Sequence, residues 1–307
     1  MHTILGAGGA IGTELVRELR ARGETIRLVG RTPKPVPGVA ETVAADLSDA
    51  AKTLAAVRGS QVVYLLAGLK YDSAVWRDQW PRIMRNTIEA CKATGARLIF
   101  FDNVYMYGCV SGPMTEATPF NPCSRKGEVR AQIATALLAA IKAGDLTALI
   151  ARSADFYGPG AKTSVANALV FAKYAAAGRA LCLLNDRVPH AYTYTPDAAR
   201  SLVLLAASET AWNQTWHVPT AGNPPTAREF ILRVAGEFGV PPKYTVLSRP
   251  LLVLAGLFDS NVRASYEMLY QSETEYLFDS TKFNQAFAFT PTDYAEGIRR
   301  TAAAYRG

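Results

Sequence analysis

Gly6-Ala-Gly-Gly-Ala-Ile-Gly12 lies between a short extended segment, 2–5, and a segment with helical spacing of apolar residues, 10–22. Its outer and central glycines have the spacing GxxGxxG. A strand-to-helix turn this tight needs positive φ angles or the absence of Cβ atoms. The helix that follows presents free N–H groups and the positive end of its dipole, which bind phosphate groups. The stretch therefore predicts the phosphate-binding turn of a dinucleotide site.

Strand-like and helix-like segments alternate through the first half of the chain. Strands are expected at 25–29, 39–44, 61–67, 97–101 and 146–151, and helices at 48–57, 73–94 and 126–143. Repeated β-α-β units with near-continuous apolar strands predict a doubly wound parallel sheet of the Rossmann type. Ligands of such a sheet bind at the carboxyl ends of its strands.

The second half of the chain is less regular. Helical segments are expected at 165–177, 196–207, 228–237, 266–270 and 294–305, and a strand at 214–218. We interpret residues 1–160 as a dinucleotide-binding domain to which later segments such as 190–220 contribute. Residues 161–307 then form mainly a smaller C-terminal substrate-binding lobe.

The composition is that of an ordinary globular protein. Of 307 residues, 49% are hydrophobic and 19% are charged, which excludes a disordered or collagen-like chain. The 33 basic and 26 acidic side chains give a net charge of +7. The excess is spread thinly, without a run of five like charges. It indicates a solvated basic surface rather than nucleic-acid binding, the alternative being a basic pocket for a phosphorylated ligand.

Cysteine usage and hydropathy favour a soluble cytoplasmic protein. Cys91, Cys109, Cys123 and Cys182 show neither CxxC nor metal-ligand spacing, which predicts buried thiols in a reducing compartment rather than disulfides, and no metal site. The longest strongly apolar run, 251–258, is eight residues. A membrane span needs about 20, so none is expected, and the N-terminus does not resemble a signal peptide.

The end of the second expected strand indicates which dinucleotide binds. An NAD site has an acidic residue there for the ribose 2′-hydroxyl, but this chain has Arg31, followed by Lys34. A guanidinium forms charge-assisted bonds to a 2′-phosphate. The sequence therefore favours NADP over NAD, although Arg31 as an exposed loop residue is the alternative.

Together these motifs resemble the extended short-chain dehydrogenase/reductase superfamily, of the NAD-dependent epimerase/dehydratase type. The segment 100–108 is similar to the family's strand that ends in Ser-Ser-x-x-Val-Tyr-Gly, and 152–160 is similar to its nicotinamide-side segment. By this resemblance Asp46 and Leu47 contact adenine, while Ala67 and Gly68 line the ribose. The expected cofactor-binding residues are Gly6, Gly8, Gly9, Ala10, Ile11, Gly12, Arg31, Lys34, Asp46, Leu47, Ala67, Gly68, Asn103, Lys126 and Ala154.

The catalytic positions depart from the family pattern. The family uses Ser or Thr together with Tyr-x-x-x-Lys, in which Tyr is the general acid/base and Lys lowers its pKa. The corresponding residues here are Asn103, Cys123 and Gly127. Cys123 would be an unusual acid/base, and a buried inert thiol is the favoured interpretation. No shift of register recovers the Tyr–Lys pair.

Other side chains near the carboxyl ends of the strands could replace the missing Tyr–Lys pair. We single out Asn103, Tyr105 and Lys126 as catalytic candidates, with Lys126 reaching the ribose if the helix start is distorted. Arg130 could contact a phosphate, or be ion-paired. Tyr107 is expected to pack. Further pocket candidates, each with a purely structural alternative, are Asp155, Tyr157, His190, Tyr192 and Tyr194.

These features predict an NADP-binding protein that acts as an oxidoreductase, epimerase or dehydratase on a hydroxyl or carbonyl group. The resemblance implies a nucleotide-sugar-like or other small substrate and suggests a homodimer through the helices at 73–94 and 126–143. The alternative is a catalytically degenerate NADP-binding sensor of redox state or of a ligand. Hydride transfer belongs to the cofactor, so its binding alone does not decide between them.

Overall fold

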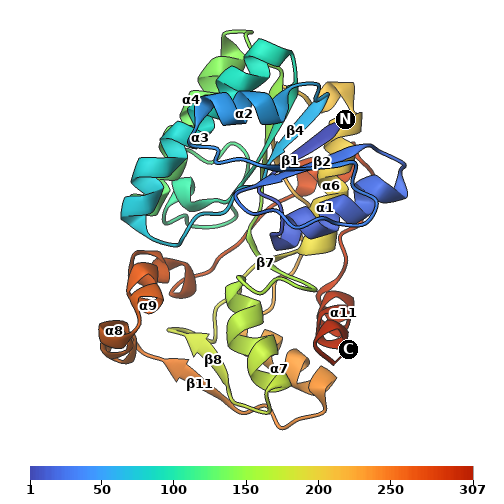
Figure 1. The fold of residues 1–307 in the computed structure, drawn as a ribbon. Helices are drawn as coiled ribbons and strands as arrows, with labels where there is room; N and C mark the ends of the chain where they lie inside the picture. Colours follow the sequence, from blue (N-terminus) through green and yellow to red (C-terminus); the bar gives the residue numbers. More distant parts are fainter. Residues whose placement is uncertain (307) are drawn as a thin grey trace.

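A seven-stranded parallel sheet forms the centre of the larger part of the molecule (Figure 1). The computed structural model describes residues 1–306. The strand order is β10-β6-β5-β4-β1-β2-β3. The strands are β1 (His2–Leu5), β2 (Ile26–Gly30), β3 (Glu41–Ala44), β4 (Val62–Leu65), β5 (Arg97–Asp102), β6 (Ala148–Arg152) and β10 (Thr215–His217). The order reverses beside β1, where β4 pairs with it on one side and β2 on the other, as a doubly wound fold requires.

Helices cover both faces of this sheet. On one face lie α1 (Ala10–Ala21) and α6 (Thr195–Ala207), which enclose a core that includes Ile4, Leu15 and Leu202. On the other lie α2 (Ala50–Val57), α3 (Ser73–Thr94) and α4 (Arg125–Lys142). The inner strands are buried on both sides, which explains their continuous apolar sequence. The predicted Rossmann-type α/β fold is confirmed.

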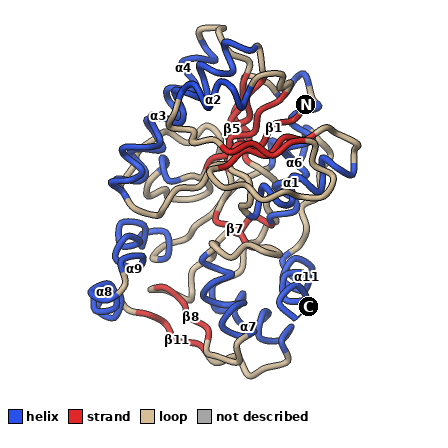
Figure 2. Tube along the Cα trace, in the orientation of Figure 1, coloured by secondary structure: helices blue, strands red, loops and turns tan. Residues whose placement is uncertain are grey.

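A smaller lobe lies below the sheet, as Figure 2 shows. It contains two parallel strand pairs, β7 (Asp155–Tyr157) with β9 (Tyr192–Tyr194) and β8 (Ala180–Leu183) with β11 (Tyr244–Leu247). Its helical elements include a π-helical turn (Asn167–Phe171), α5 (Ala172–Ala175), α7 (Ala227–Phe238) and α11 (Tyr294–Arg306). Its core is rich in aromatic residues and is separate from the sheet's two cores.

The chain passes between the two parts more than once. After the lobe's β9, α6 and β10 return to the large sheet, and α10 (Thr281–Ala286) later packs there through Phe283. Between them an arm consists of α8 (Arg249–Phe258), α9 (Ser260–Ser265) and the 3₁₀ segment η4 (Tyr266–Ser272). The apolar run at 251–258 forms α8, and among residues 1–306 no helix is long and apolar enough to cross a membrane.

Candidate functional site

The turn between β1 and α1 has the backbone that its glycines predict. Gly6 has φ +111°, and a Cβ there would lie 2.6 Å from the Ala67 Cα at the end of β4. Gly8 has φ +93°. Gly6 is therefore required both by its conformation and by the close approach of the neighbouring strand.

The same turn fits a dinucleotide phosphate group. A Cβ built on Gly8 or on Gly9 meets nothing within 4 Å, so the turn leaves open space on its outer side. Gly9 is the N-cap of α1 and has no side chain to accept from the first amides of the helix. Those amides and the positive helix end are therefore free to hold a phosphate.

Arg31 and Lys34 lie directly after β2, and both are exposed. Within residues 1–306 Arg31 has no acidic partner at ion-pair distance. Asp46, after β3, is also exposed, and its carboxylate accepts hydrogen bonds from the Ser48 N–H and hydroxyl, at 2.9 and 2.8 Å. These bonds, with a smaller contribution from Arg31, lower the pKa of Asp46. This edge of the sheet therefore offers cations at β2 and a carboxylate at β3.

The residues expected to line the cofactor elsewhere lie at the ends of β4, β5 and β6. Ala67 and Gly68 follow β4, and Gly68 is exposed. Ala154 is buried two residues after β6. The Asn103 side chain accepts from the Tyr105 N–H at 3.0 Å and so begins the 3₁₀ turn η1 (Tyr105–Tyr107). Asn103 thus holds the turn that carries Tyr105.

The structure leaves no room for a lysine at the family's Lys position. A Cβ on Gly127 would lie 2.6 Å from the Tyr105 carbonyl oxygen and 3.1 Å from the Pro122 Cβ. At the family's Tyr position, Cys123 is exposed, directly before Ser124, the N-cap of α4. The interpretation of Cys123 as a buried thiol is therefore wrong, and the expectation of buried thiols also fails for Cys109, which is exposed, while Cys91 and Cys182 are buried. Because its segment precedes the helix, the Cys123 side chain remains outside the core.

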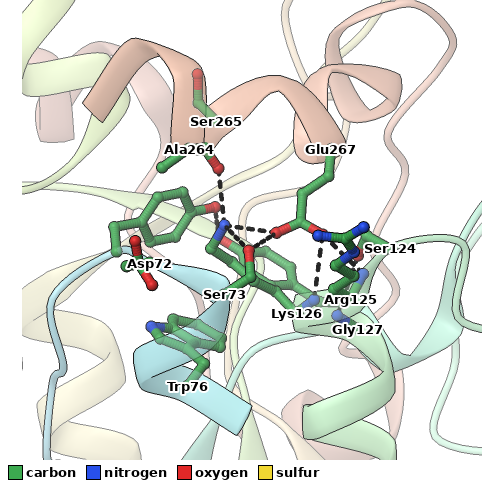
Figure 3. Close-up of polar contacts among 12 residues, drawn as sticks. Asp72, Ser73, Trp76, Ser124, Arg125, Lys126, Gly127, Ala264, Ser265 and Glu267 are labelled. Atoms are coloured by element: carbon green, nitrogen blue, oxygen red, sulfur yellow. Dashed lines mark hydrogen bonds and ion pairs between the residues drawn. The ribbon is translucent and has the colours of Figure 1, made fainter. Parts of the chain in front are cut away.

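Lys126 points toward the C-terminal arm (Figure 3). Its side chain is fully buried, and Nζ donates to Glu267 Oε1 at 2.6 Å and to the Ala264 carbonyl at 2.7 Å. Nζ also lies 3.4 Å from Ser73 Oγ and 4.4 Å from the centre of the Tyr71 ring. The ammonium is thereby saturated with protein acceptors, which does not support the expectation that it holds a ribose.

Glu267 also receives hydrogen bonds from the start of α4. Its Oε2 accepts from the Arg125 N–H at 2.7 Å and lies 3.4 Å from the Lys126 N. Burial acts to raise its pKa, but hydrogen bonds from Lys126 and Ser73, with the Lys126 charge, outweigh it and the pKa is lowered. Glu267 therefore stays ionised and binds the arm to both α3 and α4.

Tyr105 and Tyr71 form a hydroxyl pair at the same edge. The Tyr71 hydroxyl donates to the Tyr105 hydroxyl at 3.3 Å, and the Tyr105 ring stacks on Trp76 at 6.2 Å. Burial raises the pKa of both phenols. The nearby Asp155 contributes to the raised pKa of Tyr105. Both phenols therefore remain protonated at neutral pH, and because the Tyr71 hydroxyl donates to Tyr105, the Tyr105 proton is free for another acceptor.

Arg130 lies in a buried ion pair. Its Nη1 is 3.1 Å from Asp102 Oδ1, and its guanidinium stacks on Trp80 and Trp76, at 4.1 and 4.8 Å. The idea that Arg130 contacts a cofactor phosphate is therefore wrong, and the ion-paired alternative holds. Its helical position was clear, but the tryptophans that cover it come from α3.

Tyr107 is a structural residue, as expected. Its hydroxyl accepts from Arg152 Nη1 at 2.7 Å and lies 2.9 Å from His217 Nε2. His217 Nδ1 lies 2.7 Å from the Asp279 carbonyl, which can only accept, so Nδ1 carries the proton and Nε2 accepts from Tyr107. Burial lowers the pKa of His217 to about 3.

A small cavity of about 60 Å³ lies in the lobe and is lined by Asp155, Leu169, Cys182, His190, Tyr192 and Phe230, among others. His190 Nε2 is 3.0 Å from Asp155 Oδ2, and the His190 ring stacks on Tyr276 at 4.4 Å. This volume has room for a few water molecules and is well below the roughly 300–1,000 Å³ of typical ligand pockets. Asp155, His190 and Tyr192 therefore reach a common pocket.

Tyr157 and Tyr194 do not line that pocket. Both are buried in the lobe's aromatic core, where Tyr157 stacks on Tyr294 at 6.1 Å. Tyr192 and Tyr194 are two residues apart and so share a face of β9, and both rings pack against Tyr157, at 6.4 and 5.4 Å. Sequence reasoning also missed Tyr71 and Glu267. Tyr71 follows β4 at the ligand edge, which is a usable signal, whereas nothing local marks Glu267.

Comparison with known proteins agrees with this architecture. The model of the NAD dependent epimerase/dehydratase family matches residues 2–218. The chain belongs to this family. A dTDP-6-deoxy-L-talose 4-dehydrogenase (NAD(P)(+)) of Kitasatospora kifunensis is 30% identical over 80% of the chain and 82% of that protein. A 3-diazoavenalumate denitrifying reductase of a Streptomyces species is 28% identical over 79% and 83%.

Solved structures of family members share the whole fold. The UDP-glucose 4-epimerase of Thermus thermophilus in complex with NAD has a TM-score of 0.82 at 21% identity, covering 100% of this chain and 99% of that one. The dTDP-glucose 4,6-dehydratase of Streptomyces venezuelae with NAD bound has a TM-score of 0.82 at 18% identity, covering 100% and 97%. Those proteins bind NAD, whereas the expected preference of this chain for NADP is a separate question.

Proposed function

We propose that the protein is an NADP-dependent oxidoreductase that reduces a carbonyl or similarly electrophilic group of a small substrate without the family's Tyr–Lys pair. The observation that carries the proposal is the hydroxyl pair of Tyr105 and Tyr71, at the same carboxyl edge of the sheet as the open turn after β1. A nicotinamide cofactor bound there would supply the hydride. The protein's task is to orient the substrate and supply a proton.

Tyr105 is the proton donor in this proposal. Burial keeps its phenol protonated, and because its oxygen accepts from Tyr71, its own proton can go to another acceptor such as a substrate oxygen. Tyr71 hydrogen-bonds to it and lies beneath the Lys126 ammonium, which stabilises negative charge on the pair. Asn103 positions the turn, and Lys126 acts only through Tyr71.

Arg31 supports the NADP preference because it is exposed beside the phosphate-binding turn, where it would meet a 2′-phosphate. Fluorescence titration with NADPH and NADH tests this preference. We expect Arg31→Ala to weaken NADPH binding roughly tenfold and leave NADH binding unchanged. The exposed Arg233→Ala is the control. Tighter binding of NADH by the unaltered protein would contradict the assignment.

The substrate is proposed at the level of chemical class. Relatives named in the comparisons act on dTDP-linked deoxy sugar and on 3-diazoavenalumate. Nucleotide sugars, ketones and aromatic diazo compounds should therefore be screened with NADPH. Tyr105→Phe should lower kcat by roughly 10²–10⁴, whereas Tyr244→Phe, whose hydroxyl binds Asp186, should not.

One observation favours a second function, a sensor that binds the dinucleotide without turnover. Gly127 has no space for the family's lysine, and Lys126 is bound by Glu267. Tight NADPH binding with no turnover on any of the substrate classes would support the sensor. A homodimer through α3 and α4 also stays a proposal, which sedimentation of the full chain would test.

A further inference from the structure

Two exposed thiols face each other beside the start of α4. Cys109 Sγ and Cys123 Sγ lie 3.4 Å apart. The other two cysteines, Cys91 and Cys182, are buried, and burial raises the pKa of each to about 12. We propose that Cys109 and Cys123 form a reversible disulfide site, oxidised by low-molecular-weight disulfides. This site is independent of the proposed reduction of a substrate.

The backbone holds the two cysteine segments together. Gly108 has φ +69°, and a Cβ on it would lie 1.9 Å from the Asn121 carbonyl oxygen and 3.2 Å from the Cys123 N. The Asn121 N–H donates to the Met106 carbonyl at 2.9 Å. Because main chain lies against main chain, the thiols meet without relying on flexible loops. An S–S bond of about 2.0 Å needs the sulfurs, now 3.4 Å apart, to approach by roughly 1.4 Å.

The two thiols have different surroundings. Cys123 is exposed and directly precedes Ser124, the N-cap of α4, a helix start that already binds the Glu267 carboxylate. Burial and the neighbouring Cys123 raise the pKa of Cys109 to about 11. We therefore expect Cys123 to attack first and Cys109 to be the resolving thiol.

The exchange proceeds in two balanced steps. The Cys123 thiolate attacks one sulfur of oxidised glutathione, forms a mixed disulfide and releases one glutathione thiolate. Cys109 then loses its proton to solvent and attacks the Cys123 Sγ, and the second glutathione leaves as a thiolate. The protein loses two electrons and two hydrogens, and one glutathione disulfide becomes two thiols.

The disulfide would form at the rim of a small hollow. Cys109 lines that hollow together with Tyr270 and Met114. The Tyr270 hydroxyl is buried and has no hydrogen-bond partner among residues 1–306, and burial with the two nearby thiols raises its pKa. Oxidation would join the segment after η1 to the segment before α4. It would therefore fix η1, which carries Tyr105, relative to the start of α4.

The first experiment uses the full-length protein, oxidised glutathione and intact-mass measurement after alkylation. We expect the unaltered protein to lose two hydrogens, carry no glutathione and resist alkylation at both sites. Cys109→Ser should instead retain one glutathione on Cys123. Cys182→Ser is the matched control and should behave like the unaltered protein. Stable glutathione on both cysteines, or a disulfide between two chains, would overturn the proposal.

A second measurement does not depend on oxidation. A monosubstituted trivalent arsenical binds two nearby thiolates at once, so phenylarsine oxide should bind the reduced protein once. Cys109→Ala and Cys123→Ala should each lose at least roughly tenfold in affinity, because one of the two As–S bonds is gone. Equal affinity in the unaltered protein and in both variants would show that the thiols do not act as a pair and would refute the site.

Discussion

The N-termini of α1 and α4 differ in whether a negatively charged group of the protein is already bound there. At α1 the cap is Gly9, and the turn leaves open space beside the first amides. At α4 Ser124 caps the helix, and the Glu267 carboxylate accepts from the Arg125 N–H. The first helix is free to bind a ligand phosphate, whereas the second already holds an anion of the chain. The fold therefore keeps open space at the glycine turn before α1, but it leaves no space for the family's lysine at Gly127 in α4.

The largest effect is expected from Gly6→Val. A Cβ there would meet the Ala67 backbone at 2.6 Å, and φ is +111°. Overpacking and backbone strain together should destabilise the fold by about 3–5 kcal/mol. Urea unfolding followed by circular dichroism measures this loss, and NADPH binding should disappear with it.

Gly9→Ala separates the fold from the ligand at the same turn. Its Cβ meets no atom within 4 Å, so stability should change by less than about 1 kcal/mol. Its methyl group would occupy space that the dinucleotide needs, so NADPH affinity should fall. Unchanged NADPH affinity in a well-folded Gly9→Ala protein would show that the phosphates lie elsewhere.

Glu267→Gln removes the carboxylate that binds Lys126 and the N-terminus of α4. The Lys126 side chain is fully buried and the Glu267 side chain is 20% exposed, so the variant would leave a buried ammonium without its counterion. Breaking such a pair costs about 3–5 kcal/mol, and we expect the lower end because Glu267 reaches solvent. Thermal and urea unfolding measure the loss. Glu296→Gln, on the exposed surface of α11, is the control and should change stability little. An equally stable Glu267→Gln protein would mean that the arm is not held here.

A pH dependence should come from His217, which supports the turn carrying Tyr105. The imidazole has a pKa of about 3 in the fold because burial disfavours its charged form, against about 6.5 when unfolded. The unfolded chain binds the extra proton between these values, so stability falls as pH drops below about 6.5. At pH 5 the loss is about 2 kcal/mol. Urea unfolding at pH 7 and 5 checks it.

His217→Gln provides the control for that pH effect. It removes the titrating group, so the difference in unfolding free energy between pH 7 and 5 should shrink by about 2 kcal/mol. The variant should also be less stable at pH 7, because Tyr107 loses its acceptor. A pH difference that persists unchanged would assign the effect to other groups.

The glycine turn at the N-terminus of α1 could be predicted from sequence, because its backbone geometry demands glycines at fixed spacing. The Rossmann-type sheet was likewise evident, since its strands are buried on both faces and read as apolar runs. The binding of Glu267 to Lys126 and to the N-terminus of α4 could not be predicted. Lys126 and Glu267 are 141 residues apart, and local pattern says nothing about such contacts. The periodicity of apolar residues placed Arg130 on the correct helix, but it could not indicate that Arg130 packs against the tryptophans of α3.

Gly127→Ala should have a modest effect, and it tests directly whether the catalytic position is closed. A methyl group there would lie 2.6 Å from the Tyr105 carbonyl oxygen, which is main chain and cannot turn away, so we expect a loss of about 1–2 kcal/mol in unfolding free energy. Gly236→Ala is the matched control, because that exposed glycine of α7 has nothing within 4 Å of its Cβ and should gain about 0.5–1 kcal/mol. A lysine has the same Cβ, so Cys123→Tyr with Gly127→Lys should not restore the family's pair unless α4 moves away from η1. A stable Gly127→Ala protein would show that α4 can make this movement.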